Sequence, residues 1–434
     1  MTVYCLIVDV PEQIIWREQM LLASHKRERY NRLVRLHVAF FWLIQAALPI
    51  IAQDVSIQCV APNAATGVSK AVVVDGKLSL LYTSQLFALH ERQEKTGQDV
   101  QKQTEQVLDK LGLILFTAGS DLGKVAKLNI YLTQAEALPE IYKVLAQRLA
   151  GPIKPAANFV VTTLPIKGAL VAMDAVAITP SGDEQGVTKL FAVSEASLHG
   201  GISDGAILPP GSRIYVSGMA DTNSLPEATK RTLEKLTAAI GHLGPQKSDI
   251  VQLKVFLQPM SEVPAVRKII EDFFGGTAPP TIFVEWISPT PNPPIEIELI
   301  AGGKSAATKE SETVTFLTPP GTTSTKVFSR VAQINRGKLV YISGLYGLKA
   351  QTPRDEVREI FQSLGEVLKN TGSDFEHLVK ATYYVSDDSA GDKLNEIRPE
   401  FYNPLRPPAA SKAKVKGVAE QGKTVSVDMI AVTK

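Results

Sequence analysis

The same succession of helical and strand patterns of apolar residues occurs three times along this 434-residue chain. The pattern is clearest in the middle of the chain, where Leu233, Leu236 and Ile240 recur at helical spacing. Apolar and polar residues then alternate over 251–257, as in a strand with one face against a core. A second helical pattern covers 266–273. The middle stretch therefore predicts a helix, a strand and a second helix.

The stretches on either side repeat this order. The predicted elements are a helix over 99–116, a strand over 128–132 and a helix over 141–149, then a helix over 355–370, a strand over 378–385 and a helix over 391–401. With the flanking strand patterns, each unit reads β-β-α-β-α-β-β. Strands with two helices on one face form a two-layer α+β domain.

Two sets of landmarks give the period of the repeat. Similar strand ends carry serines at 84, 217 and 343, and similar closing strands carry acidic residues at 174, 298 and 428. Both sets indicate a period near 128 residues. We therefore predict domains at 55–181, 187–303 and 312–434. Linkers rich in Gly, Ser and charged residues are expected at 180–188 and 302–312.

The first 52 residues have the layout of an export signal. Basic residues at 26–35 precede an apolar run over 38–52, after which the chain becomes polar. We expect a signal peptide with an extended basic region, cleavage near Ala52, and export to the periplasm or outside. The alternative is an uncleaved anchor, although the run is short for a membrane span and contains Pro49. Translation could begin at Met1 or Met20.

Composition narrows the chemistry. The net charge is +2, from 46 basic and 44 acidic residues, which gives no reason to expect nucleic acid as a partner. The cysteines are Cys5 and Cys59, and the six histidines are scattered, so we expect neither a disulfide framework nor a metal site. No cofactor is implied.

The order of the motifs resembles the Rid (YjgF) family of imine and enamine deaminases, also labelled endoribonuclease L-PSP. In the third copy the motifs are FSRV (328–331), GKLVYISG (337–344), LVKATYYV (378–385), RPPAASKA (406–413) and VSVDMIAV (425–432). The resemblance extends from about residue 65 to the end, in three degenerate copies.

The resemblance implies a chorismate-mutase-like fold and sites in clefts between three subunits. We expect the copies to form an intramolecular pseudo-trimer and the chain to be monomeric, because short linkers raise the effective concentration of each copy. Independent domains, or trimers mixed between chains, are the alternatives. Family members hydrolyse 2-imino and enamine acids to 2-keto acids and ammonia.

Family chemistry also implies an arginine in a Pro-Ala-Arg motif, which grips the substrate carboxylate. Here the arginine position holds Ala157, Thr281 and Ala410. The glutamate that positions the attacking water matches Ala172, Glu296 and Ser426, so only the second copy keeps it. Because the usual arginine is missing from every copy, no catalytic residue can be assigned.

Further positions are candidates for lining the clefts. They are Ser84, Gln85, Ser217, Gly218, Ser343, Gly344, Phe328, Glu296 and Lys412. Lys412 and Lys414 share a strand face and could reach a cleft, although solvated lysines are the simpler interpretation. The recurring Asp174, Glu298 and Asp428 fit a structural role, such as accepting from backbone donors at the centre of the trimer, better than a catalytic one.

These observations favour an exported, non-catalytic member of the family that binds a small ligand or a protein partner in its inter-repeat clefts. An active deaminase with an altered substrate is the second hypothesis. An endoribonuclease ranks lowest, because the sequence shows no histidine pair, metal cluster or basic surplus.

Overall fold

The computed structural model describes residues 56–434, except 89–98, 181–187, 194–200, 289–291 and 304–311. These described residues form one compact unit from Ser56 to Lys434. The expected export signal and Cys5 lie outside the described residues, as do the middles of both expected linkers.

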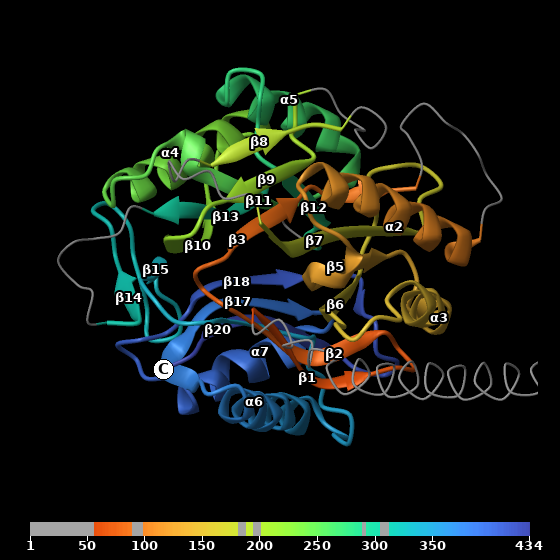
Figure 1. Cartoon of the computed structure of the whole chain (residues 1–434). Coiled ribbons are helices and arrows are strands. Elements are labelled where there is room, and N and C mark those ends of the chain that lie inside the picture. Colours follow the sequence, from red (N-terminus) through yellow and green to blue (C-terminus); the bar gives the residue numbers. More distant parts are fainter. Residues whose placement is uncertain (1–55, 89–98, 181–187, 194–200, 289–291, 304–311) are drawn as a thin grey trace, which may run out of the picture. The chain divides into compact units, whose positions relative to one another are not determined.

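Each repeat contains three or more strands, a helix, a strand, a helix and a final set of strands (Figure 1). The first repeat comprises β1 (Ile57–Asn63), β2 (Val68–Val74), β3 (Ser79–Thr83), β4 (Leu86–Phe87), α2 (Val100–Thr117), β5 (Val125–Leu132), α3 (Leu138–Arg148), β6 (Ala156–Val161) and β7 (Val171–Thr179). The second comprises β8 (Lys189–Phe191), β9 (Gly205–Leu208), β10 (Ser212–Ala220), α4 (Leu225–Gly241), β11 (Ile250–Leu257), α5 (Val263–Phe273), β12 (Thr281–Glu285) and β13 (Ile295–Gly303). The third comprises β14 (Val314–Leu317), β15 (Val331–Ile334), β16 (Leu339–Ile342), α6 (Pro353–Asn370), β17 (Leu378–Val385), α7 (Asp388–Ile397), β18 (Ala409–Lys414), β19 (Gly417–Val418) and β20 (Val425–Val432).

The α+β prediction is confirmed, with one difference in strand number. Each repeat starts with an additional strand, namely β1, β8 or β14, and the first repeat also has the short β4, so four strands precede the first helix of that repeat and three precede the first helix of the other two. These strands pair as hairpin partners of β2, β9 and β15. The last predicted helix, over 391–401, is displaced, because α7 begins at Asp388, where the Asp387 side chain accepts a hydrogen bond from the Ala390 backbone amide.

The four main strands of each repeat have the same order. In the first repeat β6 and β5 are parallel, β5 and β7 antiparallel, and β7 and β3 antiparallel. The second repeat has the order β12-β11-β13-β10, and the third has β18-β17-β20-β16.

The opening hairpin of each repeat extends the sheet of another repeat. Strand β9 of the second repeat pairs with β3 of the first, β15 of the third with β10 of the second, and β2 of the first with β16 of the third. Each repeat therefore donates a hairpin to the preceding one, and the first donates to the third. This connectivity is what an intramolecular pseudo-trimer requires.

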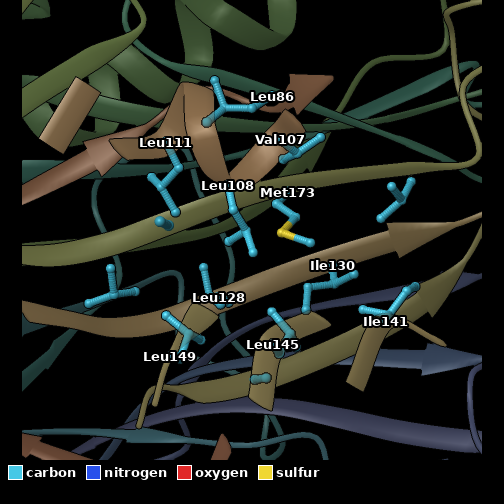
Figure 2. Packing of buried hydrophobic residues seen from close by; sticks show 14 of the residues in the cluster. Leu86, Val107, Leu108, Leu111, Leu128, Ile130, Ile141, Leu145, Leu149 and Met173 are labelled. Carbon is cyan, nitrogen blue, oxygen red and sulfur yellow. The ribbon is translucent and has the colours of Figure 1, made fainter. Parts of the chain in front are cut away.

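One face of each sheet packs against its own two helices. In the first repeat Leu108 and Leu111 of α2 meet Leu128 and Ile130 of β5 (Figure 2). Their spacing of three residues on the helix and two on the strand puts each pair on one face. The same arrangement recurs in the second and third repeats.

The opposite face of each sheet is buried as well. Alternation along β11 leaves Gln252 and Lys254 off the helix side, yet they are only 6% and 5% exposed. Apolar residues beside them belong to clusters drawn from all three repeats, which include Tyr82, Tyr215 and Tyr341. The polar face of these strands thus meets other repeats and not solvent.

Candidate functional site

The serines that mark the repeat each bridge two repeats. Ser217 Oγ donates to the Ser329 carbonyl at 2.6 Å and accepts from the Ala410 amide at 2.7 Å. Equivalent bonds join Ser84 to Ser203 (2.6 Å) and Thr281 (3.2 Å), and Ser343 to Ser69 (2.5 Å) and Ala157 (2.8 Å). These contacts define three junctions: the first around Ser84, the second around Ser217 and the third around Ser343.

Each junction thus brings the expected arginine position of one repeat to the serine of another. The side chains at these positions are Ala157, Thr281 and Ala410, and the Thr281 hydroxyl donates to the Pro279 carbonyl at 2.9 Å. None of the three side chains can present a charged group to a substrate carboxylate.

The residue at the glutamate position differs in size between junctions, and the residue next to it compensates. Ala172 pairs with Phe87 across β7 and β4, whereas Glu296 pairs with Ala220 across β13 and β10. Phe87 is buried in an apolar cluster that includes Ala172 and Ile282. An aromatic ring therefore fills the space in the first junction that a glutamate side chain takes in the second.

The third junction is filled in a similar way. Tyr346 packs against the same apolar cluster, on the side of Ser426, which is at the glutamate position. Burial raises the pKa of the Tyr346 hydroxyl. Ser426 Oγ also lies 3.2 Å from Asn158 Oδ1 across the junction. This junction is polar but carries no carboxylate.

The second junction retains an acid. Ser411 Oγ, from the third repeat, accepts from the Gly218 amide at 3.1 Å and hydrogen-bonds to the Glu296 carboxyl. A Cβ at residue 218 would lie 2.0 Å from Glu296 Oε1. Glycine at 218 is therefore required for the carboxyl group to lie against the backbone.

Burial raises the pKa of the Glu296 carboxyl to about 7, and neighbouring Glu298 adds to the shift. Hydrogen bonding by Ser411 and the positive charges of Arg330 and Lys380 oppose it. The group can therefore gain or lose a proton near neutral pH, as a general acid or base must.

Arg330 of the third repeat contributes a cation to this junction. Its Nη1 donates to the Gly218 carbonyl at 2.7 Å, and its guanidinium carbon lies 5.3 Å from the centre of the Phe328 ring. Burial lowers the pKa of Arg330, and Glu296 partly opposes that shift. The expected motif did not predict Arg330, since the residue lies near the start of its repeat. A comparison of the copies could have found it, because Arg330 follows the early serine of its repeat. The same position holds Lys70 in the first repeat and Asp204 in the second.

The remaining sequence candidates divide between the junctions and other places. Gln85 Oε1 accepts from the Phe283 amide at 3.1 Å in the first junction, and the Gly344 amide donates to the Ala157 carbonyl at 2.9 Å in the third. Phe328 contacts Arg330 in the second. The side chain of Lys412 instead reaches toward α7, where Nζ lies 3.3 Å from Asn395 Oδ1.

Its neighbour Lys414 also faces α7, with Nζ 2.7 Å from Asp388 Oδ2. The structure therefore directs both lysines away from the bridging serine Ser217.

The recurring acids lie in a buried cluster on the faces of the sheets that meet other repeats. Their partners are lysine, asparagine and tyrosine side chains and not the backbone donors we expected. Asp174 accepts from Asn129 and Tyr131, Glu298 from Lys380 at 2.6 Å, and Asp428 lies 2.8 Å from Lys127. These groups neutralise each other. No hydrogen bond among the described residues joins them to a bridging serine.

The described residues contain no group of three or more His, Cys, Asp or Glu side chains placed to hold a metal ion. No helix among them is long and apolar enough to cross a membrane.

Comparison with known proteins places this geometry in context. The family model described as endoribonuclease L-PSP matches residues 59–179, 202–302 and 322–433. A mouse protein named 2-iminobutanoate/2-iminopropanoate deaminase is 28% identical over 112 residues, which cover 22% of this chain and 82% of the relative. Protein DfrA of Myxococcus xanthus is 26% identical, over 24% of this chain and 85% of its own.

Solved structures match one repeat at a time. NMB1025 of Neisseria meningitidis, a member of the YjgF protein family, is 19% identical with a TM-score of 0.22, covering 28% of this chain and 95% of its own. YyfB of Yersinia pestis, from the Rid protein family, is 26% identical with a TM-score of 0.26, covering 28% and 98%. The family-model matches, which together span most of the chain, are the stronger finding.

Proposed function

The chain belongs to the Rid (YjgF) family, in three tandem copies, and from that premise we propose that it binds a small ligand at a junction between repeats without hydrolysing imines. The chain has the family fold, and its serines join the repeats. The side chain that would grip a substrate carboxylate at the usual place is missing.

One observation carries this proposal. The arginine position is Ala157, Thr281 or Ala410, and each backbone amide there is bonded to a serine hydroxyl of another repeat. The backbone at each position is thus bonded across a junction, while the side chain is neutral. Without a bidentate cation, a 2-imino acid loses the contact that orients it for attack by water.

The test is an assay of ammonia release. The purified protein would be supplied with 2-iminopropionate or 2-iminobutyrate generated in situ, next to a heat-denatured sample. We expect the two samples to release ammonia at the same rate. Release well above the denatured sample, proportional to protein concentration, would overturn the non-catalytic proposal.

An active hydrolase with an altered substrate is the second candidate, and Glu296 favours it. Its carboxyl pKa of about 7 suits proton transfer at neutral pH, and Ser411 is bonded to it. The same assay with Glu296→Gln separates the two candidates. If the wild-type protein releases ammonia and Glu296→Gln does not, the second junction is an active site.

We also propose that the protein is exported, on the basis of the basic and apolar pattern of residues 1–52. Sequencing the amino terminus of protein isolated from its native source tests this. We expect a mature chain that starts near Gln53. A chain that starts at Met1 or Met20 would refute cleavage after Ala52.

A further inference from the structure

The three junctions differ most in charge. The residue that follows the early serine is Asp204 in the first, Arg330 in the second and Lys70 in the third. Buried Asp204 Oδ2 accepts from the Val193 amide at 2.7 Å, and Lys70 is exposed. Only the second junction therefore combines a half-buried cation at this position with the acid Glu296 at the glutamate position.

Hydrogen bonds hold the Arg330 guanidinium in place and leave part of it available. Nη1 donates to the Gly218 carbonyl at 2.7 Å and Nε to the Thr323 carbonyl at 3.3 Å. Nη2 donates to no acceptor among the described residues. A guanidinium fixed at two nitrogens loses little entropy when it binds a carboxylate through the third.

The two opposite charges of the second junction are not paired with each other. Each shifts the pKa of the other, yet no ion pair joins Arg330 to Glu296 in the part of the chain that the structure describes. Alanines at 220 and 410 keep the neighbouring side chains short. Both charged groups are half-buried, whereas Ser84, Gln85 and Thr281 of the first junction are buried.

We propose that the second junction is the ligand site of this chain, and that it binds a small α-amino acid, with Arg330 receiving the carboxylate and Glu296 the ammonium group. The inference rests on the proposed function, ligand binding at a junction, and specifies its place and its ligand class. A zwitterion fits because its carboxylate would neutralise Arg330 and its ammonium group would neutralise Glu296. The first junction has no cation at either position, and the third has no acid at the glutamate position.

The charge of Glu296 makes binding depend on pH. The ionisable groups that act on it are Glu298, Arg330 and Lys380, and the Ser411 hydroxyl bonds to it. An ammonium group prefers the ionised carboxylate, and the Glu296 pKa is about 7. Affinity for an amino acid should therefore rise about tenfold between pH 6 and pH 8, whereas affinity for propionate, which has no ammonium group, should not.

Calorimetric titration of the purified protein with L-alanine tests the proposal. We expect saturable binding, at least tenfold weaker for Arg330→Met and for Glu296→Gln, and unchanged for the matched variant Lys70→Met. Propionate should bind more weakly than L-alanine at pH 8. Circular dichroism would establish that each variant is folded.

A double variant tests the same junction if a variant with a single substitution fails to fold. Ala220→Phe with Glu296→Ala copies the Phe87 and Ala172 pair of the first junction, which the fold already accommodates. We expect it to fold and to lose binding.

The outcomes separate this inference from the proposed function. Equal affinity in Arg330→Met and the wild-type protein, or no binding of L-alanine at millimolar concentration, overturns the assignment of this site and ligand. Release of ammonia in the imine assay overturns the non-catalytic function instead. In that case loss of both activity and alanine binding in Arg330→Met, with Lys70→Met unaffected, would still support the site.

Discussion

Lys127 Nζ lies 2.8 Å from Asp428 Oδ1, and this ion pair joins the first repeat to the third. Both side chains are almost fully buried. Burial lowers the pKa of Lys127, although Asp428 partly opposes that shift. Burial would raise the pKa of Asp428, but Lys127, Lys254 and Lys380 together hold it below its ordinary value. The charged forms of the two side chains therefore stabilise each other in the interior.

Removing one member of this pair should destabilise the fold strongly. Lys127→Met leaves the Asp428 carboxylate buried with fewer cations, and we expect a loss of about 3 kcal/mol in the free energy of unfolding. The measurement is urea unfolding followed by circular dichroism. Lys124→Met is the matched control, because Lys124 is partly exposed and lies 3.9 Å from Asp121, so its loss should cost under about 1 kcal/mol. Equal stability of the two variants would contradict the prediction.

The bridging serine of the second junction should also contribute to stability. Ser217→Ala leaves the Ala410 amide and the Ser329 carbonyl without their partner. We expect a loss of about 1–3 kcal/mol in the free energy of unfolding, because a polar group left unpaired in a partly buried place is costly. Ser389→Ala, at an exposed position of α7, should change it by no more than about 0.5 kcal/mol. A Ser217→Ala variant as stable as that control would show that the bridge is dispensable.

Stability should fall as the pH rises past the ordinary pKa of glutamate. The Glu296 pKa is about 7 in the folded chain against an ordinary value of 4.5. Between these values the folded chain binds more protons than the unfolded chain, so its stability decreases with increasing pH. For a half-buried group we expect a decrease of about 1–2 kcal/mol across this window. Between pH 4.5 and pH 7.5, the free energy of unfolding should decrease less in Glu296→Gln than in the wild-type protein. An identical decrease would show that Glu296 is not the group responsible.

An intramolecular pseudo-trimer would make one chain a complete particle. Each repeat donates a hairpin to another repeat of the same chain, so the described sheets leave no donor for a second chain. Gel filtration with light scattering should therefore give a mass near one chain, 47.0 kDa for the full sequence. A particle of three chains would instead favour repeats exchanged between molecules.

Several features of this protein are determined by its sequence. Local periodicity is enough to predict β17 with the bounds 378–385 that the structure has, because the residues of a strand face alternate sides of the sheet. The serines and acids give the period, and the missing arginine is plain at Ala157, Thr281 and Ala410. Each of these depends on residues close together in the chain or on a comparison between copies.

Only the tertiary structure decided how the repeats meet. The bond between Ser217 and Ala410 joins residues 193 positions apart, and no local pattern encodes such a contact. The lysines on the polar faces look solvent-facing in a single repeat, yet they are buried because other repeats cover that face. Arg330 is at the second junction for the same reason. Its place depends on a hairpin that crosses to another sheet, and such long-range pairing is set by the packing of whole faces rather than by the residues beside it.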